Sequence, residues 1–335
     1  MKLVTFFDGN ENLGVYREEV IYRVRDFGPS FPQTMIEYLE GGEKSYRQLL
    51  EFYSSERLKE SEGLNPDKVK IMAPLPKPKS CRDGYAFRQH VETARRNRGV
   101  PMIPEFDQYP VFYFTNHQAI DGPGEIFCMP DHFRQLDFEL EVAIIIGKKG
   151  RNIPASEADG YIAGYTIMND LSARQLQMEE MLLNLGPAKG KDFSTVLGPW
   201  LVTPEELEQF RTETKEGHTG KQYNMEMSCH VNGIRVSAGN MNMMDWTFAE
   251  LIERASYGAD LYPGDVIGSG TVGTGCFLEL NGTGKLNDPA YIPQWLKEGD
   301  TISLGVEGIG ILTNVIRKEK SEWSILEQKK SKSPK

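Results

Sequence analysis

The sequence contains little cysteine and no long hydrophobic run. Four cysteines are spread over 335 residues without a Cys-x-x-Cys pair, at positions Cys81, Cys128, Cys229 and Cys276. Such spacing excludes a disulfide scaffold and predicts reduced thiols, as in a cytoplasmic protein. The longest apolar candidate, residues 142–146, is far shorter than the roughly 20 residues of a membrane helix. We therefore expect a cytoplasmic protein without a membrane partner.

Positive charge is also scarce. Lys and Arg number 38 against 48 Asp and Glu, so the formal net charge is −10. Nucleic acid and anionic membranes carry charge of the same sign, which excludes both as general partners. The N-terminus has one lysine and a short apolar run that breaks at Asp8, which is not the pattern of a secretory signal peptide.

The domain organisation follows from length and proline content. A chain of 335 residues corresponds to about two domains at roughly 150 residues each. Prolines crowd residues 73–78 (APLPKP), which continue neither a helix nor a central strand. We predict a small β-rich domain with a helix over residues 1–72, a linker over 73–82 and a larger domain over 83–317. The polar, basic tail 318–335 is predicted to be disordered.

Many short strand-like runs with few helices predict an α+β, β-rich fold instead of an alternating βαβ fold. We expect a hairpin over residues 226–237, because Asn232-Gly233 is a strong turn signal between alternating residues. Further strands are expected over residues 136–147, 266–280 and 299–317. Helices are expected over residues 34–60, 85–98, 172–185 and 246–255.

A strand with paired carboxylates carries the sharpest chemical signal. In residues 136–146 (LDFELEVAIII), Glu139 and Glu141 are two residues apart and share one face, with Asp137 before them. A solvated strand face would explain such a pair. The apolar residues that follow instead indicate burial, where neighbouring carboxylates persist if a proton or a cation neutralises them. Oxygen ligands favour a hard cation, Mg²⁺ or Ca²⁺.

A second polar segment, residues 168–177 (MNDLSARQLQ), lies at the start of an expected helix. Asp170 there has the position of a helix N-cap residue, a common use of aspartate. Arg174 and Gln177 are three residues apart and share a helix face, for which a solvated surface is the simplest reading.

Five segments together resemble the fumarylacetoacetate hydrolase family. They follow the family's order and cover about residues 70–317, with the closest likeness to the shorter bacterial members. The segments are residues 83–90 (DGYAFRQH), 137–141 (DFELE), 169–177 (NDLSARQLQ), 190–200 (GKDFST and GPW) and 263–280 (PGD, GT and GCFLEL). The resemblance implies that the domain over residues 83–317 is the catalytic domain and forms a mixed β-roll or sandwich, and that the protein is a homodimer.

The resemblance also implies a divalent metal site. Its carboxylate ligands include a further aspartate that is typical of members most like fumarylacetoacetase itself. A Gly-Lys-x-Phe-x-Thr motif lies beside the metal and the substrate in the family. The matching residues in this chain are Asp83, Glu139, Glu141, Asp170, Lys191 and Thr195.

The family's general base matches His90, and the carboxylate that orients it matches Glu279. A histidine acts as a base near neutral pH, and a buried carboxylate fixes its tautomer and stabilises the imidazolium. We expect Glu279 on a strand, with apolar Leu278 and Leu280 on the opposite face. A structural salt bridge is the alternative role for Glu279.

Substrate contacts follow from the same resemblance. Arg174, Gln177 and Lys191 would bind a substrate carboxylate and stabilise a developing oxyanion. Tyr85 and Thr271 match substrate-contacting positions, although Tyr85 equally suits an aromatic side chain that caps the core. A further substrate-contacting tyrosine, expected near residues 114–116, has no clear match.

The implied function is metal-dependent hydrolysis of a C–C bond in a 1,3-diketo acid such as fumarylacetoacetate, as in tyrosine degradation and other aromatic amino acid catabolism. The metal would polarise a carbonyl group as a Lewis acid. Decarboxylation or isomerisation of an oxo-acid, or acylpyruvate hydrolysis, is the alternative on the same scaffold. A non-catalytic binding protein is a third hypothesis. Fold alone does not choose among them.

Overall fold

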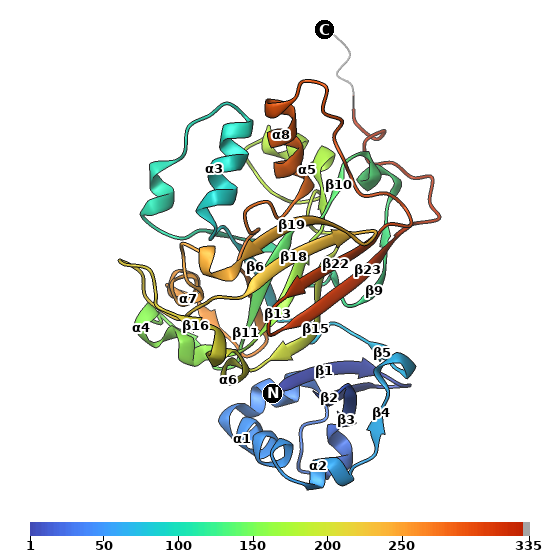
Figure 1. The fold of residues 1–335 in the computed structure, drawn as a ribbon, viewed down its shortest axis with the longest axis vertical. Coiled ribbons are helices and arrows are strands. Elements are labelled where there is room, and N and C mark those ends of the chain that lie inside the picture. The colour runs from blue at the N-terminus through green and yellow to red at the C-terminus, as the bar shows by residue number, and fades with distance from the viewer. Residues whose placement is uncertain (331–335) are drawn as a thin grey trace.

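The computed structural model describes residues 1–330 and is built from two large β-sheets with helices around them (Figure 1). The larger sheet has twelve strands in the order β4-β3-β2-β1-β15-β13-β11-β21-β6-β7, with β5 beside β1 and β8 beside β15. Its strands are β1 (Lys2–Phe7), β2 (Glu11–Arg17), β3 (Val20–Arg23), β4 (Gly63–Leu64), β5 (Lys70–Ile71), β6 (Ser80–Gly84), β7 (Phe112–Thr115), β8 (Ile120–Asp121), β11 (Leu140–Ile146), β13 (Ile162–Asp170), β15 (Thr195–Val202) and β21 (Asp265–Gly268).

The second sheet has five strands in the order β19-β18-β22-β23-β9. They are β9 (Gly124–Cys128), β18 (Glu226–Val231), β19 (Ile234–Asn240), β22 (Thr301–Val306) and β23 (Gly310–Lys318). Three short pairs join β10 (Leu136–Asp137) to β14 (Ser172–Ala173), β12 (Gly150–Arg151) to β20 (Asp260–Leu261), and β16 (Arg211–Thr212) to β17 (Gln222–Tyr223).

The helices lie between and beyond these strands. The α-helices are α1 (Met35–Tyr53), α2 (Arg57–Glu60), α3 (Arg88–Asn97), α4 (Ala155–Ala158), α5 (Arg174–Met181), α6 (Pro204–Leu207), α7 (Phe248–Ser256) and α8 (Phe277–Asn287). Short 3-10 helices are η1 (Val24–Phe27), η2 (Pro66–Lys68), η3 (Pro104–Asp107), η4 (Pro130–Arg134), η5 (Asp159–Tyr161), η6 (Glu208–Phe210) and η7 (Met241–Met243). Within residues 1–330, no helix combines the length and the hydrophobicity that crossing a membrane requires.

β11 is buried on both of its faces, which explains its continuous apolar sequence. Val142 and Ile144 belong to the same buried cluster as Leu304 of the second sheet. The alternate residue Ile145 belongs to another cluster, which contains Met35 of α1. Because successive side chains of a strand point to opposite faces, one face of β11 packs toward the second sheet and the other toward α1. The predicted β-rich α+β fold is confirmed.

The N-terminal strands continue the larger sheet. β1 pairs antiparallel with β15, so that Leu3 lies opposite Leu201. Residues 1–72 form the blue part at the bottom of Figure 1, and helices α3, α5 and α8 gather at the opposite end. The sheet thus runs across the linker that the sequence places at 73–82, and the division into domains remains a prediction.

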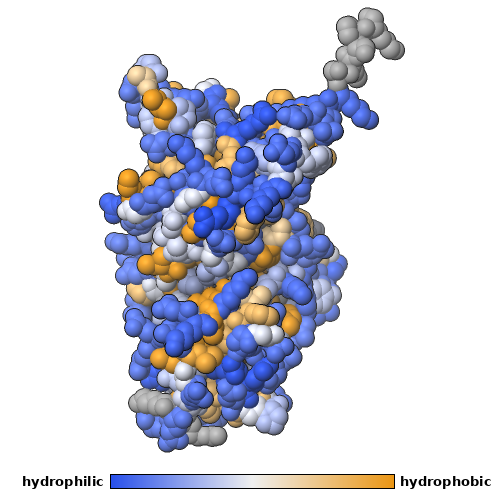
Figure 2. All heavy atoms as spheres, turned by 90° about the vertical axis from the view of Figure 1, so that its right-hand side faces the viewer, coloured by the Kyte–Doolittle hydropathy of each residue, from blue (hydrophilic) through white to orange (hydrophobic). Residues whose placement is uncertain are grey.

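In the face shown in Figure 2, hydrophobic patches occupy mainly the lower half among hydrophilic side chains.

Several local predictions are confirmed. The expected hairpin is β18–β19, and Asn232 and Gly233 at its turn have φ values of 52° and 78°. The expected helix over 85–98 is α3, which begins later, at Arg88, and ends before Gly99. The final strand pair over 299–317 is β22–β23.

Two predictions about elements were wrong. The strand expected over 266–280 ends at Gly268, and Phe277–Asn287 form the helix α8 instead. The alternation in this segment suggested a strand, but the carboxylate of Asp137 accepts hydrogen bonds from the first backbone N–H groups of α8 and stabilises a helix start there. Asp170 is the last residue of β13, and α5 begins only at Arg174, so Asp170 is not an N-cap residue.

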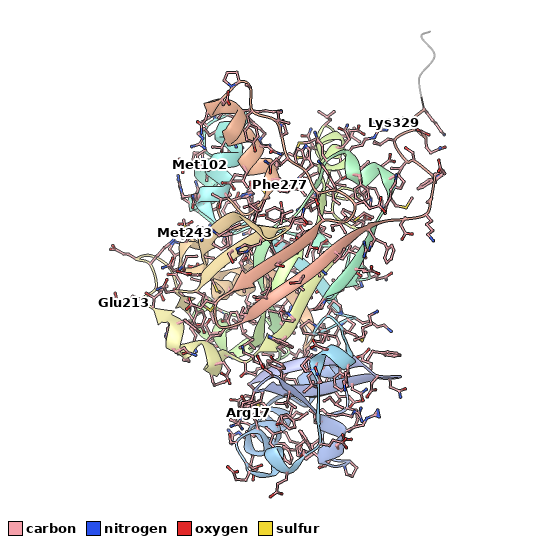
Figure 3. The ribbon with its side chains drawn as sticks, turned by 45° about the vertical axis from the view of Figure 1, so that its right-hand side comes forward. Arg17, Met102, Glu213, Met243, Phe277 and Lys329 are labelled. Atoms are coloured by element: carbon pink, nitrogen blue, oxygen red, sulfur yellow. The ribbon has the colours of Figure 1, made fainter. Side chains whose placement is uncertain are left out.

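The predicted disorder of the tail was wrong for its first part. The hydroxyl of Ser324 donates to Asp131, and the backbone N–H of Leu326 donates to the same carboxylate at 3.1 Å. Lys329 forms an ion pair with Glu179 of α5 (Figure 3). These contacts hold the tail against the catalytic part of the chain. Residues 331–335 lie outside the described residues.

Candidate active site

Four buried carboxylates meet on one side of the larger sheet, where β6 and β13 end and β11 begins. Asp83 is on β6, Glu141 is on β11, Asp170 ends β13, and Glu139 directly precedes β11. One oxygen of each lies within 4.8 Å of the others. The strand pairing explains this meeting. β13 pairs with β11, β11 with β21, and β21 with β6, so the four strands lie side by side in the order β13-β11-β21-β6. The structure therefore brings together all four carboxylates that the sequence predicts as metal ligands.

The electrostatics of this cluster fit a bound cation. Burial, followed by the charge of Asp170, raises the pKa of Asp83 to about 8. Burial and the charge of Asp83 raise the pKa of Glu141 well above its usual value. One buried oxygen of Glu141 and one of Asp170 have no hydrogen-bond partner. Unpaired carboxylate oxygens in a buried site are suitable ligands for a hard divalent ion.

Lys191 neutralises part of the cluster. Its ammonium group contacts Glu139 and donates to Asp170 at 2.8 Å. Burial alone lowers the pKa of Lys191, but the charges of Asp170 and Glu139 outweigh burial and raise it. A protonated ammonium has no free electron pair for a metal. Lys191 is therefore a neighbour of the proposed ion. Thr195, opposite Asp170 on β15, is buried beside it, and its role as a ligand remains a prediction.

Arg174 holds Glu139 from the other side. Its Nη2 donates to Glu139 at 2.7 Å, its Nε to Asp137 at 2.8 Å and its Nη1 to Gln177 at 2.9 Å. The guanidinium is buried, so the solvated helix surface considered for Arg174 was wrong. Burial raises the pKa of Glu139, but the charges of Lys191 and Arg174 outweigh it and lower that pKa to about 2. Contacts of Arg174 and Gln177 with substrate remain predictions.

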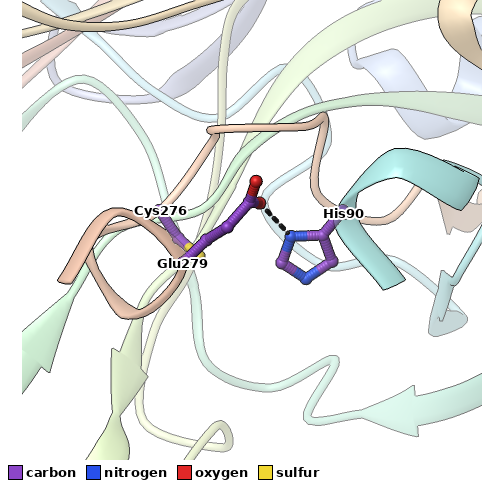
Figure 4. A group of neighbouring side chains, drawn as sticks. All are labelled: His90, Cys276 and Glu279. Atoms are coloured by element: carbon purple, nitrogen blue, oxygen red, sulfur yellow. Dashed lines mark hydrogen bonds and ion pairs between the residues drawn. The ribbon is translucent and has the colours of Figure 1, made fainter. Parts of the chain in front are cut away.

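A histidine–glutamate dyad, drawn in Figure 4, forms the second part of the site. His90 on α3 and Glu279 on α8 are joined by a 2.7 Å hydrogen bond between Nδ1 and Oε2. The other oxygen of Glu279 accepts from the backbone N–H of Thr274 at 2.9 Å. Both side chains are buried. The predicted pairing is confirmed, whereas the strand predicted for Glu279 is a helix, since this residue lies in the first turn of α8.

Two residues predicted to contact substrate lie at the edge of this site. The ring of Tyr85 meets that of His90 edge to face, with centroids 6.0 Å apart. The hydroxyl of Thr271 lies 3.3 Å from Glu141, within reach of the carboxylate cluster. Cys276 is fully buried next to the dyad, and burial raises its pKa well above the usual thiol value. A neutral buried thiol is a poor nucleophile.

Sequence reasoning missed Tyr113. The β6–β7 pairing places Tyr113 opposite Asp83, and its hydroxyl donates to Asp170. Burial and the charge of Asp170 raise the pKa of Tyr113 well above its usual value, so it stays a donor. The available signal was the short apolar run at 110–115, but only its pairing with the strand of Asp83 identifies which residue enters the site.

The two sheets and the site define an enzyme whose centre joins buried carboxylates to a histidine–glutamate dyad. Comparison with known proteins identifies the family to which this enzyme belongs. Residues 79–317 match the family model described as "Fumarylacetoacetate (FAA) hydrolase C-terminal". The chain belongs to the fumarylacetoacetate hydrolase family, whose members act on small molecules.

Relatives in this family differ in their reactions. "Oxaloacetate tautomerase Fahd2a, mitochondrial" from Rattus norvegicus is 31% identical over 297 residues, 87% of this chain and 82% of the relative. The 2,4-didehydro-3-deoxy-L-rhamnonate hydrolase of Sphingomonas sp. (strain SKA58) is 31% identical over 214 residues, 64% of this chain and 66% of the relative. The solved fumarylacetoacetate hydrolase of Exiguobacterium antarcticum superposes with a TM-score of 0.71 at 26% identity, covering 95% of this chain and 100% of that one.

Proposed function

We propose that this enzyme hydrolyses a C–C bond in a 1,3-diketo acid, such as fumarylacetoacetate, with a divalent metal ion. The observation that carries the proposal is the buried His90–Glu279 dyad beside four buried carboxylates. The dyad can activate water, and the carboxylates can hold an ion that binds the dicarbonyl group. Relatives named as hydrolases of a fumarylacetoacetate and of a didehydro-deoxy sugar acid support this reaction class.

The proposed reaction begins with proton removal by His90. Glu279 accepts the Nδ1–H hydrogen bond, which leaves Nε2 unprotonated and able to take a proton from water. The negative charge of Glu279 then stabilises the imidazolium. The Thr274 N–H bond to Glu279 keeps its carboxylate in place.

The bond changes balance as a hydrolysis. The water oxygen forms a bond with the acyl carbonyl carbon, and the C–C bond to the central methylene carbon breaks. The electron pair goes to the enolate of the leaving oxo acid, and the His90 imidazolium returns its proton to that carbon. For fumarylacetoacetate the products are fumarate and acetoacetate, for an acylpyruvate they would be a carboxylic acid and pyruvate, and water is the only co-reactant.

The ion would be held by Asp83, Glu139, Glu141 and Asp170, which offer oxygen ligands suited to Mg²⁺ or Ca²⁺. When bound, it would polarise a carbonyl group and stabilise negative charge on an enolate oxygen. Lys191, next to the same carboxylates, would attract the carboxylate of the substrate.

Tautomerisation of an oxo-acid such as oxaloacetate is the second candidate. The relative from Rattus norvegicus is named for that reaction and covers more of this chain than the hydrolase from Sphingomonas. In this reaction His90 would move a proton between carbon and oxygen, and no water would be consumed.

Hydrolysis and tautomerisation are distinguished by following the loss of ultraviolet absorbance of the substrate and by identifying the products. Metal-stripped protein is given acylpyruvates, fumarylacetoacetate and enol-oxaloacetate, with and without Mg²⁺, Mn²⁺ or Ca²⁺, and products are identified by NMR. Metal-dependent formation of two acids that is lost in His90→Ala supports hydrolysis. Conversion of enol- to keto-oxaloacetate without cleavage of any diketo acid would replace hydrolysis with tautomerisation.

A further inference from the structure

We propose that Asp137 is a positioning residue that holds the two halves of the site in register. The inference rests on the proposed function. Asp137 lies two residues before Glu139 and is fully buried on β10. Its carboxylate connects the arginine that holds Glu139 with the helix that carries Glu279.

The first half of the connection is the start of α8. Oδ1 of Asp137 accepts from the backbone N–H of Phe277 at 2.7 Å, and Oδ2 accepts from that of Leu278 at 2.9 Å. The first N–H groups of a helix have no partner within the helix. The N-cap residue Cys276 supplies no side-chain hydrogen bond. Asp137 therefore caps α8 from a distant strand, and a negative charge there is also favoured by the helix dipole.

The second half is Arg174. Oδ2 of Asp137 accepts from its Nε at 2.8 Å, while the same guanidinium donates to Glu139. The β10–β14 pairing, with Asp137 opposite Ser172, brings the start of α5 to this position. One carboxylate thus sets the place of Glu139 in the carboxylate cluster and of Glu279 in the dyad.

The position of Glu279 is sensitive to this cap. Glu279 lies one residue after Leu278, so a shift of the helix start moves its carboxylate relative to His90. Misplacement of a reacting group by about 1 Å can cost roughly 100-fold in rate. The metal ligands themselves keep their other partners, because Glu139 and Asp170 still contact Lys191.

Asp137→Asn is the direct test, because asparagine keeps the shape but turns one acceptor atom into a donor. We expect kcat to fall about 100-fold while KM changes little, and the Kd for Mg²⁺ to rise less than about tenfold. Asp131→Asn is the matched control, since Asp131 is also buried and accepts from Ser324 and Leu326, neither of which belongs to the carboxylate cluster or the dyad. Equal activity of the two variants would overturn the proposal.

A double variant separates positioning from general destabilisation. Because Asp137 holds Glu279 through the start of α8, we expect Asp137→Asn to cost much less rate in the His90→Ala background, where the dyad is already lost, than in the unchanged protein. Rate losses that multiply in the double variant would overturn the proposal.

A readout independent of substrate distinguishes this proposal from the proposed function. The low-field NMR resonance of the hydrogen-bonded His90 Nδ1–H is assigned by its absence in His90→Ala. We expect it in the unchanged protein and in Asp131→Asn, and expect it to shift or vanish in Asp137→Asn. If no diketo acid is turned over, the proposed function fails while this resonance still decides the role of Asp137.

Cys276→Ser keeps the test decisive if Asp137→Asn does not fold. Serine at the N-cap position can accept from an N–H group of the first turn of α8 and so replace the missing cap locally. We expect the double variant Asp137→Asn with Cys276→Ser to fold and to regain the His90 resonance in part. A folded double variant without that resonance would overturn the proposal.

Discussion

Glu139 and Glu141 share a strand face in sequence, yet their surroundings are opposite. Glu139 contacts the cations of Arg174 and Lys191, which lower its pKa to about 2 in spite of its burial. Glu141 is surrounded by carboxylates, and burial with the charge of Asp83 raises its pKa well above the usual value. The first carboxylate stabilises the metal-free fold near neutral pH, and the second destabilises it.

The same substitution at the two positions should therefore act with opposite signs. In EDTA at pH 7, Glu141→Gln removes an unfavourable buried charge and is expected to stabilise the fold by about 1 kcal/mol or more. Glu139→Gln breaks a buried ion pair and is expected to destabilise it by about 3 kcal/mol. Chemical denaturation measures both, and thermal shifts with Mg²⁺ should be reduced in each. Changes of the same sign in EDTA would contradict this account of the cluster.

Because of His132, the free energy of unfolding is expected to decrease as the pH falls. Burial lowers its pKa from 6.5 to about 4, and its ring lies 4.0 Å from that of Phe193. The unfolded chain binds a proton near pH 6.5 and the folded chain only near pH 4, so this contribution to stability is full above 6.5 and declines toward pH 4. It amounts to at most about 3 kcal/mol. We expect His132→Asn to flatten the loss of unfolding free energy over this range, as measured by chemical denaturation of the variant and the unchanged protein at pH values from 7 to 4.

At the scale of elements, the loop that contains Gly190 packs closely against α5, and this contact fixes the position of the next residue, Lys191. A Cβ added at Gly190 would lie 2.6 Å from Cβ and 2.7 Å from Cα of Gln177, so only glycine permits this contact. At Gly233, in the β18–β19 turn, no atom lies within 4 Å of an added Cβ, and only its φ of 78° opposes a side chain.

Gly190→Ala and Gly233→Ala form a matched pair. Each is expected to lower the unfolding free energy by about 1–2 kcal/mol, the first by a clash and the second by backbone strain. Only Gly190→Ala moves Lys191, so we expect its activity to fall about tenfold or more while that of Gly233→Ala is unchanged. Equal activities in a diketo-acid assay at matched folded fractions would contradict a positioning role for this loop.

At the scale of the whole molecule, residues 1–72 are part of the sheet that forms the site. β1 covers the edge of β15, and Leu3 and Leu13 share a buried cluster with Leu197 and Leu201 of β15. β15 in turn pairs with β13, which ends at Asp170. Removal of the N-terminal strands would expose an apolar strand edge, a known aggregation hazard.

A chain of residues 73–335 is therefore expected to aggregate or to unfold without cooperativity. Size-exclusion chromatography measures the aggregation, and thermal unfolding followed by circular dichroism measures the cooperativity. The full chain is measured in parallel for comparison. A monodisperse, cooperatively unfolding fragment with full activity would contradict the dependence and would support the predicted boundary at 73–82. The same chromatography with light scattering tests the homodimer, which remains a prediction, as does the cytoplasmic location.

The sequence by itself determined the parts of the site that depend on local spacing. The two-residue period of a strand put Glu139 and Glu141 on one face, whereas Asp83, His90 and Lys191 were implied by the resemblance to the family's motif segments. The relation between Glu139 and Glu141 holds because neighbours along a strand are related by its repeat, whatever surrounds it. The hairpin at Asn232-Gly233 was predictable for the same reason.

Only the tertiary structure decided which groups meet across the chain. It made the segment of Glu279 a helix, because a carboxylate 140 residues away in sequence (Asp137 to Phe277) caps its start. It also determined that the hydroxyl of Tyr113 donates to Asp170, and that the guanidinium of Arg174 donates to both Asp137 and Glu139. Such partners are chosen by packing and strand register between distant segments, for which a single sequence carries no local repeat. The ionisation of each buried carboxylate follows from those partners, since burial penalises every charge and only a neighbouring group offsets that cost.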